Sequence, residues 1–280
     1  MPSSPRLLMC PPLHFGVDYV INPWMQGRIG SAVPLRAQAQ WDALHAALSA
    51  LADIQTARPG PGLPDMPFAA NAGLVLEDTF VVSRFLHPQR QGEAPLFADW
   101  FRERGWNVRE LPAGIAFEGA GDALLDRAAP RLWLGHGHRS DAAAAPALAD
   151  LLDIETIPLR LTDPRFYHLD TCFCPLQGGG LLYYPPAFDE PAQAAIAARV
   201  PAGQRIAVGE ADALDFACNA ISIGDTVVLN RASPGLRDAL ARAGFSVVEI
   251  ALDEFLKAGG SAKCLTLRLD EPRLSETVAG

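Results

Sequence analysis

The chain has 280 residues, of which 49% are hydrophobic and 20% are charged, and its formal net charge is −9. This is an ordinary soluble composition, long enough to bury a sizeable core in one large domain or two modest ones. Lys and Arg are scattered rather than striped and no apolar stretch is long enough to span a bilayer, so neither nucleic acid nor a membrane is an expected partner.

The five cysteines are odd in number and lack the spacing of a disulfide framework. Residues 1–12 contain one Arg and a short apolar patch, too short for the hydrophobic region of a signal peptide. Reduced thiols in a cytoplasmic protein are the simplest interpretation.

The first half of the chain alternates strand and helix patterns. Residues 74–76 and 80–82 predict a hairpin with a short loop between them, and residues 132–134 predict a short buried strand. The alanine-rich segment 141–152 predicts a helix with its leucines on one side. Residues 58–67, rich in Pro and Gly, predict a loop rather than a domain boundary.

The second half continues the same alternation. Strands are expected at 181–184, 225–230, 246–250 and 263–269, with a helix at 233–243 and a short helical turn at 252–256. The periodicity amounts to roughly four or five strand-strand-helix-strand units. No low-complexity linker divides the chain, so the sequence predicts an α/β protein with a single domain.

The densest cluster of reactive side chains lies in residues 167–174. If this segment is a strand, His168, Asp170, Cys172 and Cys174 share one face. Ligands two residues apart on a strand are about 7 Å apart, so one metal ion cannot collect all four. Two interpretations stay open: a core-facing strand with satisfied polar groups, or a pocket lined by His168 and Asp170 with the two thiols packed behind it.

Cys264 is the candidate nucleophile. It follows the glycine pair 259–260, which permits close approach of a ligand to the backbone, and Lys263 adds a charge that favours a thiolate. A lone cysteine is more often structural, but a cysteine nucleophile needs a base that is adjacent in space, and His168 can supply it.

Three other motifs are weaker. Residues 117–122 predict a turn carrying two carboxylates, and residues 135–139 predict a surface loop with two histidines. Residues 178–180 lack the helix and lysine of a phosphate-binding loop. The residues alone therefore support a thiol-histidine-carboxylate hydrolase only as one hypothesis among others.

Seven segments in order carry a family resemblance: Met9–Pro12, Tyr19–Met25, Asn71–Gly73, Ser83–Glu93, Glu118–Asp122, His168–Phe173 and Lys263–Thr266. With them the chain resembles the guanidine-modifying superfamily of arginine deiminases, dimethylarginine hydrolases and arginine:glycine amidinotransferases. Within it the chain is most similar to arginine dihydrolase, the N-terminal domain of a bifunctional arginine dihydrolase/ornithine cyclodeaminase. The cyclodeaminase half is expected to be absent.

The resemblance implies a five-bladed α/β propeller of strand-strand-helix-strand modules, with residues 1–280 as a single catalytic domain. It implies neither a cofactor nor a metal, and it leaves a homo-oligomer open. The implied catalytic residues are Cys264, His168 and Glu118. The implied substrate-binding residues are Asn22, Asn71, Arg90, Arg139 and Asp170; a guanidinium fork suits a substrate carboxylate, and a carboxylate suits a substrate guanidinium.

The chain departs from the family pattern at Asn71. Dimethylarginine hydrolases and many deiminases have Asp at the matching position, preceded by an acidic residue where this chain has Ala70. An amide cannot neutralise a guanidinium, but it can bond an uncharged ureido group as donor and acceptor. Asn71 therefore argues against dimethylarginine and is compatible with a site that also holds citrulline.

The expected activity is arginine dihydrolase, which hydrolyses L-arginine to L-ornithine, carbon dioxide and two ammonia through a covalent cysteine intermediate. The alternatives are a deiminase that stops at citrulline, an amidinotransferase or dimethylarginine hydrolase, and a protein that only binds arginine. The sequence alone does not decide between ornithine and citrulline.

Overall fold

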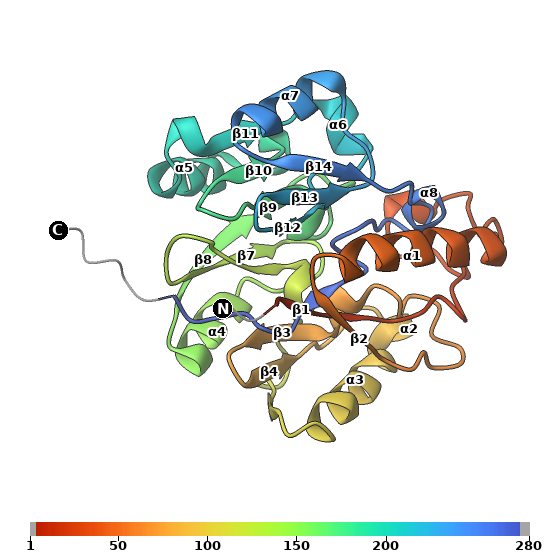
Figure 1. The fold of residues 1–280 in the computed structure, drawn as a ribbon. Helices are drawn as coiled ribbons and strands as arrows, with labels where there is room; N and C mark the ends of the chain where they lie inside the picture. Colours follow the sequence, from red (N-terminus) through yellow and green to blue (C-terminus); the bar gives the residue numbers. More distant parts are fainter. Residues whose placement is uncertain (1–3, 275–280) are drawn as a thin grey trace.

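Residues 4–274 are described by a computed structural model, and within them the strands form five separate sheets of three strands (Figure 1). Each sheet has one antiparallel pair and one parallel pair that share the middle strand. The sheets are β15 (Leu267–Arg268), β1 (Arg6–Met9) and β2 (Asp53–Thr56); β3 (Gly73–Leu76), β4 (Thr79–Val82) and β5 (Asn107–Arg109); β6 (Ala123–Leu125), β7 (Arg131–His136) and β8 (Glu155–Arg160); β9 (Phe173–Pro175), β10 (Leu181–Tyr183) and β11 (Arg205–Ala207); and β12 (Ile221–Ile223), β13 (Thr226–Leu229) and β14 (Ser246–Glu249).

Helices make the connections between the parallel strands, because a parallel pair cannot be joined by a tight turn. These helices lie towards the outside of the molecule in Figure 1, with the strands nearer its middle. They are α1 (Pro34–Ser49), α2 (Pro88–Gln91), α3 (Glu93–Arg102), α4 (Ala144–Leu152), α5 (Glu190–Arg199) and α7 (Pro234–Arg242). Two short helices, α6 (Glu210–Leu214) and α8 (Asp253–Leu256), lie in other connections.

Short 3₁₀ helices occupy several of the remaining turns. They are η1 (Pro23–Met25), η2 (Ala69–Ala72), η3 (Gly119–Gly121), η4 (Leu169–Thr171), η5 (Pro185–Ala187) and η6 (Ala202–Gln204). Three of them, η2, η3 and η4, come directly or almost directly before the first strand of a sheet, and η3 packs against both η2 and η4.

Most of the expected elements are confirmed, as is the α/β class. The predicted hairpin is formed by β3 and β4, where Leu74 pairs with Val81. The expected strands at 132–134, 181–184, 225–230 and 246–250 correspond to β7, β10, β13 and β14, and the expected helices at 141–152 and 233–243 correspond to α4 and α7.

The prediction that residues 167–174 form one continuous strand is wrong. His168 precedes η4, and the strand β9 begins only at Phe173. The turn is fixed by its own side chains, since the Thr171 hydroxyl donates to the His168 carbonyl oxygen at 2.6 Å. Such local bonds compete with strand pairing. His168, Asp170, Cys172 and Cys174 therefore do not lie along one strand face.

The expected strand at 263–269 is also mostly wrong, because only Leu267 and Arg268 pair as a strand. Residues 261–266 form turns, in which the Leu265 amide donates to the Ser261 carbonyl. The short strand pairs with β1, so a segment near residue 264 completes the sheet begun near residue 6. This pairing places Cys264 in the turn just before β15, the strand that completes the first sheet.

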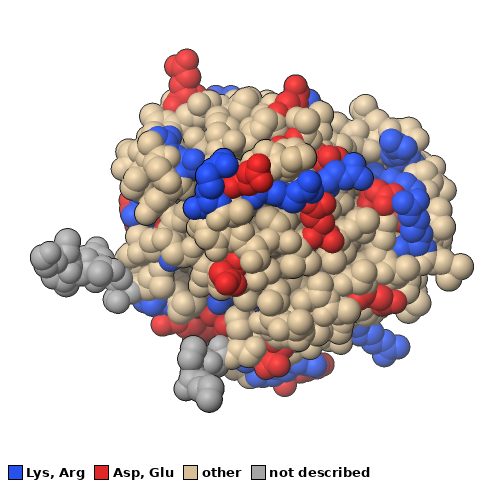
Figure 2. Space-filling model, turned by 45° about the horizontal axis from the view of Figure 1, so that its top comes forward, with Lys and Arg blue, Asp and Glu red and all other residues tan. Residues whose placement is uncertain are grey.

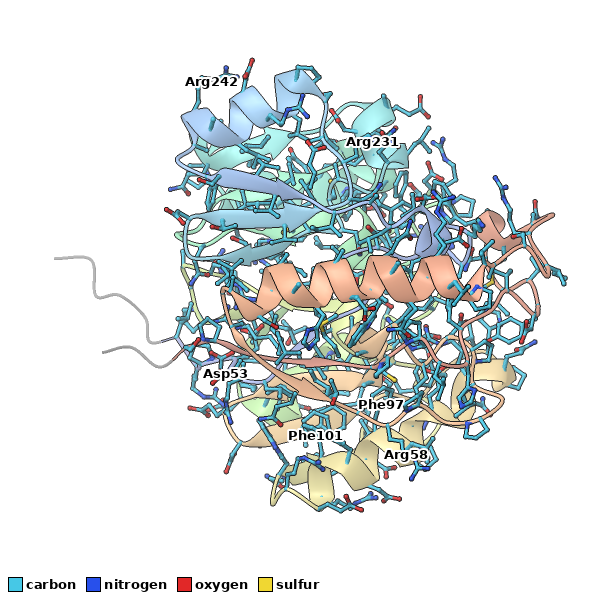
Figure 3. The ribbon with its side chains drawn as sticks, turned by 45° about the vertical axis from the view of Figure 1, so that its right-hand side comes forward. Asp53, Arg58, Phe97, Phe101, Arg231 and Arg242 are labelled. Carbon is cyan, nitrogen blue, oxygen red and sulfur yellow. The ribbon has the colours of Figure 1, made fainter. Side chains whose placement is uncertain are left out.

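Aromatic packing between helix and sheet is dense beneath the second sheet. Phe97 and Phe101 of α3, labelled in Figure 3, are fully buried against the strands. The rings of Phe101 and Phe80 are stacked, with centroids 3.6 Å apart. Burial of large aromatic side chains contributes strongly to stability, so this contact holds α3 to β4.

The exposed surface carries charges of both signs. In the view of Figure 2, Lys and Arg side chains alternate with Asp and Glu rather than forming a continuous basic face. Over residues 4–274, none of the helices combines the length and apolarity that a membrane crossing requires.

Candidate active site

The candidate site is built from turns that precede the first strands of the five sheets. The polar residues in these turns are Asn71 before β3, Glu118 before β6, His168 and Asp170 before β9, Asn219 before β12, and Cys264 before β15. All six are buried. Because the same place in each unit supplies a polar side chain, residues far apart in the sequence meet in one region.

His168 and Glu118 are in direct contact through their side chains. Nε2 of His168 lies 2.7 Å from Oε2 of Glu118. The same carboxylate oxygen accepts from Arg139 at 3.0 Å, and Oε1 accepts from the Leu86 amide at 3.2 Å. Glu118 thus has a partner on each oxygen, and it fixes the orientation of the imidazole ring.

The charges around Glu118 decide its ionisation. Burial would raise the pKa of Glu118, but Arg139 and the hydrogen bond with His168 outweigh it and hold the pKa below its ordinary value. Burial lowers the pKa of His168 to about 4, although Glu118 opposes the shift. At neutral pH, Glu118 is therefore a carboxylate and His168 a neutral imidazole, with its proton on Nε2 because an ionised carboxylate only accepts.

Cys264 is buried between Asn219 and Asp170. Its Sγ lies 3.1 Å from Nδ2 of Asn219 and 3.4 and 3.6 Å from the two carboxylate oxygens of Asp170. Burial and the Asp170 charge raise the pKa of the Cys264 thiol well above its ordinary value. Burial also raises the pKa of Asp170 to about 6, with Lys263 opposing the shift. At neutral pH the pair therefore consists of a protonated Cys264 thiol beside an ionised Asp170 carboxylate.

Arg90 and Asn71 form a second buried network. Arg90 makes a bidentate pair with Glu93 at 2.8 Å for each bond, and its remaining terminal nitrogen donates to Oδ1 of Asn71, also at 2.8 Å. Nδ2 of Asn71 donates to the Glu118 carbonyl at 3.3 Å. The Asn71 amide therefore accepts through its oxygen and donates through its nitrogen, and these two partners fix its orientation.

A glycine allows the second network to approach the first. A Cβ atom at Gly121 would lie 2.2 Å from Nδ2 of Asn71 and 3.4 Å from Cγ of His168. Any side chain at this position would displace the Asn71 amide. Gly121 therefore lets Asn71 approach the side of the site where His168 lies.

Asn22 and Arg139 each donate a side-chain hydrogen bond to a backbone carbonyl, and these bonds hold the segment around Asn22 next to the candidate site. Asn22 caps η1 through Oδ1, and its Nδ2 donates to the Ala258 carbonyl at 3.0 Å. Arg139 donates to the Ile21 carbonyl at 2.9 Å, and its guanidinium lies 4.5 Å from the centre of the Tyr167 ring. The segment 21–25 is thereby fastened beside His168 and Glu118.

Seven of the eight residues expected in the site take part in one of three contact groups, and Asn22 lies beside the first. His168, Glu118 and Arg139 form the first, Cys264 and Asp170 the second, and Arg90 with Asn71 the third, while Asn22 borders the first through the segment it caps. Among the hydrogen bonds of residues 4–274, none joins Sγ of Cys264 to His168.

The sequence reasoning missed Asn219 and Asp65, and it noted the carboxylate of Asp122 without giving it a role in the site. Asn219 contacts the candidate nucleophile, Asp65 accepts from Tyr19 beside Arg90, and Asp122 accepts from the Leu169 amide and the Ser140 hydroxyl. A signal for Asn219 existed, since it occupies the place before β12 that Asn71 occupies before β3. Recognising it required the five units to be aligned with one another.

The chemistry of this site does not point to a metal. Among the residues that the structure describes, no group of three or more His, Cys, Asp or Glu side chains could hold an ion. A buried thiol, an imidazole oriented by a carboxylate, and flanking arginines and carboxylates together define the class of a cysteine enzyme acting on a polar, charged substrate.

Comparison with known proteins identifies the family. Residues 36–270 match the family described as N,N dimethylarginine dimethylhydrolase, eukaryotic. The N(G),N(G)-dimethylarginine dimethylaminohydrolase of Mycobacterium tuberculosis is 41% identical over 269 residues, which are 96% of this chain and 87% of that protein. The chain belongs to this dimethylarginine dimethylaminohydrolase family, in agreement with the resemblance seen in its motifs.

Higher identity is found with a cyanobacterial enzyme. The bifunctional arginine dihydrolase/ornithine cyclodeaminase ArgZ of Synechocystis sp. is 54% identical over 279 residues, which are 100% of this chain and 40% of ArgZ. The chain thus spans about two fifths of that relative. A crystal structure of the N-terminal domain of ArgZ, a C264S mutant bound to substrate, has a TM-score of 0.95 and covers 96% of this chain and 100% of that one.

Proposed function

We propose that the protein is an arginine dihydrolase, which converts L-arginine and two waters into L-ornithine, carbon dioxide and two ammonia. The observation that carries the proposal is the match along the whole N-terminal domain of ArgZ, which is described as an arginine dihydrolase. The N71S variant of that domain was solved covalently bonded to a reaction intermediate. Its altered residue carries the same number as Asn71 here.

The site residues support a covalent mechanism in which the first proton comes from sulfur. In the free site Cys264 holds its proton and His168 is neutral, for the reasons given by their pKa shifts. A bound guanidinium brings positive charge to Asp170 and Cys264, which favours the thiolate. The thiol proton then passes to Nδ1 of His168, since Nε2 is engaged with Glu118.

The thiolate attacks the guanidinium carbon and forms a C–S bond. His168, now an imidazolium stabilised by Glu118, protonates a terminal nitrogen of the substrate, and the C–N bond breaks to release ammonia. Neutral His168 next takes a proton from water, which attacks the same carbon. The C–S bond breaks and Cys264 recovers its proton, leaving citrulline.

The dihydrolase repeats this cycle on the bound ureido group. Cys264 attacks the ureido carbon, a second ammonia leaves, and water releases the carbamate of ornithine, which loses carbon dioxide. Asn71 supports this second cycle because its amide bonds a neutral ureido group as donor or acceptor. The expected role of Arg90 and Arg139 at the substrate α-carboxylate requires the substrate to displace a bond, because Arg90 is engaged with Glu93 and Asn71. Arg139 is likewise engaged with Glu118 and the Ile21 carbonyl. Asn22 suits the polar end of the substrate.

The arrangement of the sheets supports a finer description of the fold. The five sheets share one strand arrangement, and a turn before the first strand of each faces the same site. A five-bladed α/β propeller is expected to have this arrangement. We propose that residues 1–280 act as one catalytic domain of this kind, without cofactor or metal, in the cytoplasm. A homo-oligomer is compatible with this proposal.

Product analysis is the direct test. Purified protein with L-arginine, and with neither metal nor nucleotide added, should give one ornithine and two ammonia per arginine consumed. Accumulation of citrulline with one ammonia would make the protein a deiminase. Formation of guanidinoacetate when glycine is added would make it an amidinotransferase, and equilibrium binding of arginine without ammonia release would make it a binding protein.

Two cysteine variants, compared with each other, separate a loss of catalysis from a loss of folding. Cys264→Ser should abolish turnover, whereas Cys174→Ala, which alters another buried thiol, should retain it with some loss of stability. Activity that survives Cys264→Ser in a folded protein excludes the covalent mechanism.

Dimethylarginine hydrolysis is the second candidate, favoured by the family match and by the mycobacterial relative. It predicts dimethylamine and citrulline from N,N-dimethylarginine. Both substrates carry the same guanidinium charge, so Asn71 does not separate them at the first step; it favours the dihydrolase because its amide can bond the neutral ureido group of the second cycle. Comparing kcat/KM for arginine and dimethylarginine decides between the two.

A further inference from the structure

Among the hydrogen bonds of the described residues, Asn219 is the one neutral side chain that bonds to the sulfur of Cys264. It is fully buried, and it lies in the turn before β12, 45 residues before the cysteine. The mechanism described above does not use it. The Asn219 side chain bonds to three groups at once: the sulfur of Cys264, the backbone amide of Cys264 and the carbonyl oxygen of Asp170.

The two ends of the Asn219 amide have different partners. Oδ1 accepts from the backbone amide of Cys264 at 3.1 Å. Nδ2 donates to Sγ of Cys264 at 3.1 Å and to the Asp170 carbonyl at 3.0 Å. Because the acceptor end is fixed by a backbone N–H, the end facing sulfur is the donor end.

The backbone strengthens this arrangement. The Asn219 carbonyl accepts from the Lys263 amide at 3.3 Å, and the Asn219 amide donates to the Phe216 carbonyl at 3.0 Å. The side chain therefore extends from an anchored turn, and its position does not depend on the substrate. A donor held in place before the reaction costs no reorganisation when charge develops on the atom it faces.

The charges around the sulfur explain why a hydrogen-bond donor is needed to stabilise the thiolate. Asp170 presents its carboxylate at 3.4 Å, which opposes a thiolate, and Lys263 is the adjacent positive charge. A hydrogen bond to an ionised acceptor is stronger than one to a neutral acceptor. Asn219 thus favours the thiolate over the thiol, at the atom where the negative charge forms.

We propose that Asn219 is a catalytic residue, which stabilises the Cys264 thiolate during its formation and during its release from each covalent intermediate. The role deepens the proposed function and rests on it for the identity of the reaction. In a dihydrolase the thiolate forms and leaves twice per arginine, so the donor acts in four steps of one turnover.

Asn219→Asp is the sharpest variant. It keeps the shape of the side chain and the acceptor for the Cys264 amide, but replaces the donor facing sulfur with a carboxylate oxygen. Asn230→Asp is its matched control, because Asn230 also accepts from one backbone amide, that of Leu252, and donates to one backbone carbonyl, that of Asp215, with no sulfur nearby.

Two measurements are needed for each variant. The first is the pH dependence of Cys264 alkylation by iodoacetamide without substrate, with the modified peptide quantified by mass spectrometry. The second is kcat and KM for arginine. Asn219→Asp should move the alkylation profile to higher pH and lower kcat by roughly tenfold to hundredfold, and Asn230→Asp should leave both unchanged.

Asn219→Ala provides a second test if the aspartate variant does not fold, because it removes the donor without adding a charge. It should lower kcat and slow alkylation in the same direction. An unchanged alkylation profile overturns the proposal, including the case in which only KM rises, since Asn219 would then act by positioning Asp170. If the wild-type protein does not act on arginine, the proposed function fails, and the alkylation profiles still decide the role of Asn219.

Discussion

Nε2 of His168 and Oε2 of Glu118 are 2.7 Å apart and both residues are almost completely buried. This contact leaves only Nδ1 of His168 to exchange protons with sulfur, water or a leaving amine. It also places a fixed negative charge beside the imidazolium that the proposed mechanism forms. In that mechanism the imidazole is therefore oriented, and its charge balanced, before any substrate binds.

Replacing Glu118 with glutamine tests this relationship. The amide keeps the size of the side chain but cannot balance the imidazolium, so kcat/KM for arginine should fall by at least about 100-fold. Glu110→Gln, at an exposed residue whose carboxylate lies 3.8 Å from Arg84, is the control and should have wild-type activity. Equal activity of both variants would show that the carboxylate is structural.

Asn71 should control the product. With Asn71→Asp, a carboxylate faces Arg90 and disfavours contact with a neutral ureido group, so citrulline should accumulate in place of ornithine. The ratio of citrulline to ornithine after complete consumption of arginine, measured by chromatography, checks this. Ornithine as the sole product of a folded Asn71→Asp protein would remove Asn71 from the account of the second cycle.

The acid limb of activity should report Asp170. Its pKa is raised to about 6 by burial, so the ionised form that suits a guanidinium is present above pH 6 and is lost as the pH falls through that value. His168, with a pKa lowered to about 4, stays neutral over the same range. kcat/KM should therefore fall below about pH 6, approaching tenfold per unit of pH.

The pH profile of the wild-type protein with arginine measures this directly. Thermal unfolding followed over the same range separates loss of activity from loss of structure. A flat kcat/KM down to pH 4.5 would be incompatible with an essential Asp170 carboxylate of raised pKa.

The stacked pair of Phe80 and Phe101 predicts a large effect on stability. Phe101→Ala should lower the free energy of unfolding by about 3–5 kcal/mol, because it leaves a cavity between α3 and β4. Leu35→Ala, at an apolar residue that is 86% exposed, should change it by less than about 0.5 kcal/mol. Urea titrations of the two variants provide the comparison.

The sequence by itself determined the α/β class, the hairpin at β3 and β4, and most of the strands and helices. These follow from local periodicity and turn residues, which depend on neighbours only a few positions away. The ordered motifs determined the family as well, because they identify a superfamily without requiring its geometry. The fine conformation of the 167–174 and 263–269 segments was not accessible in this way.

Only the tertiary structure decided how the turns meet. The 167–174 segment is a turn because Thr171 and Asp122 satisfy its backbone, and Asp122 belongs to another unit. Cys264 meets Asn219 and Asp170 because β15 pairs with β1. Contacts between separate turns depend on how whole sheets are arranged, and no local pattern in a single segment encodes that arrangement.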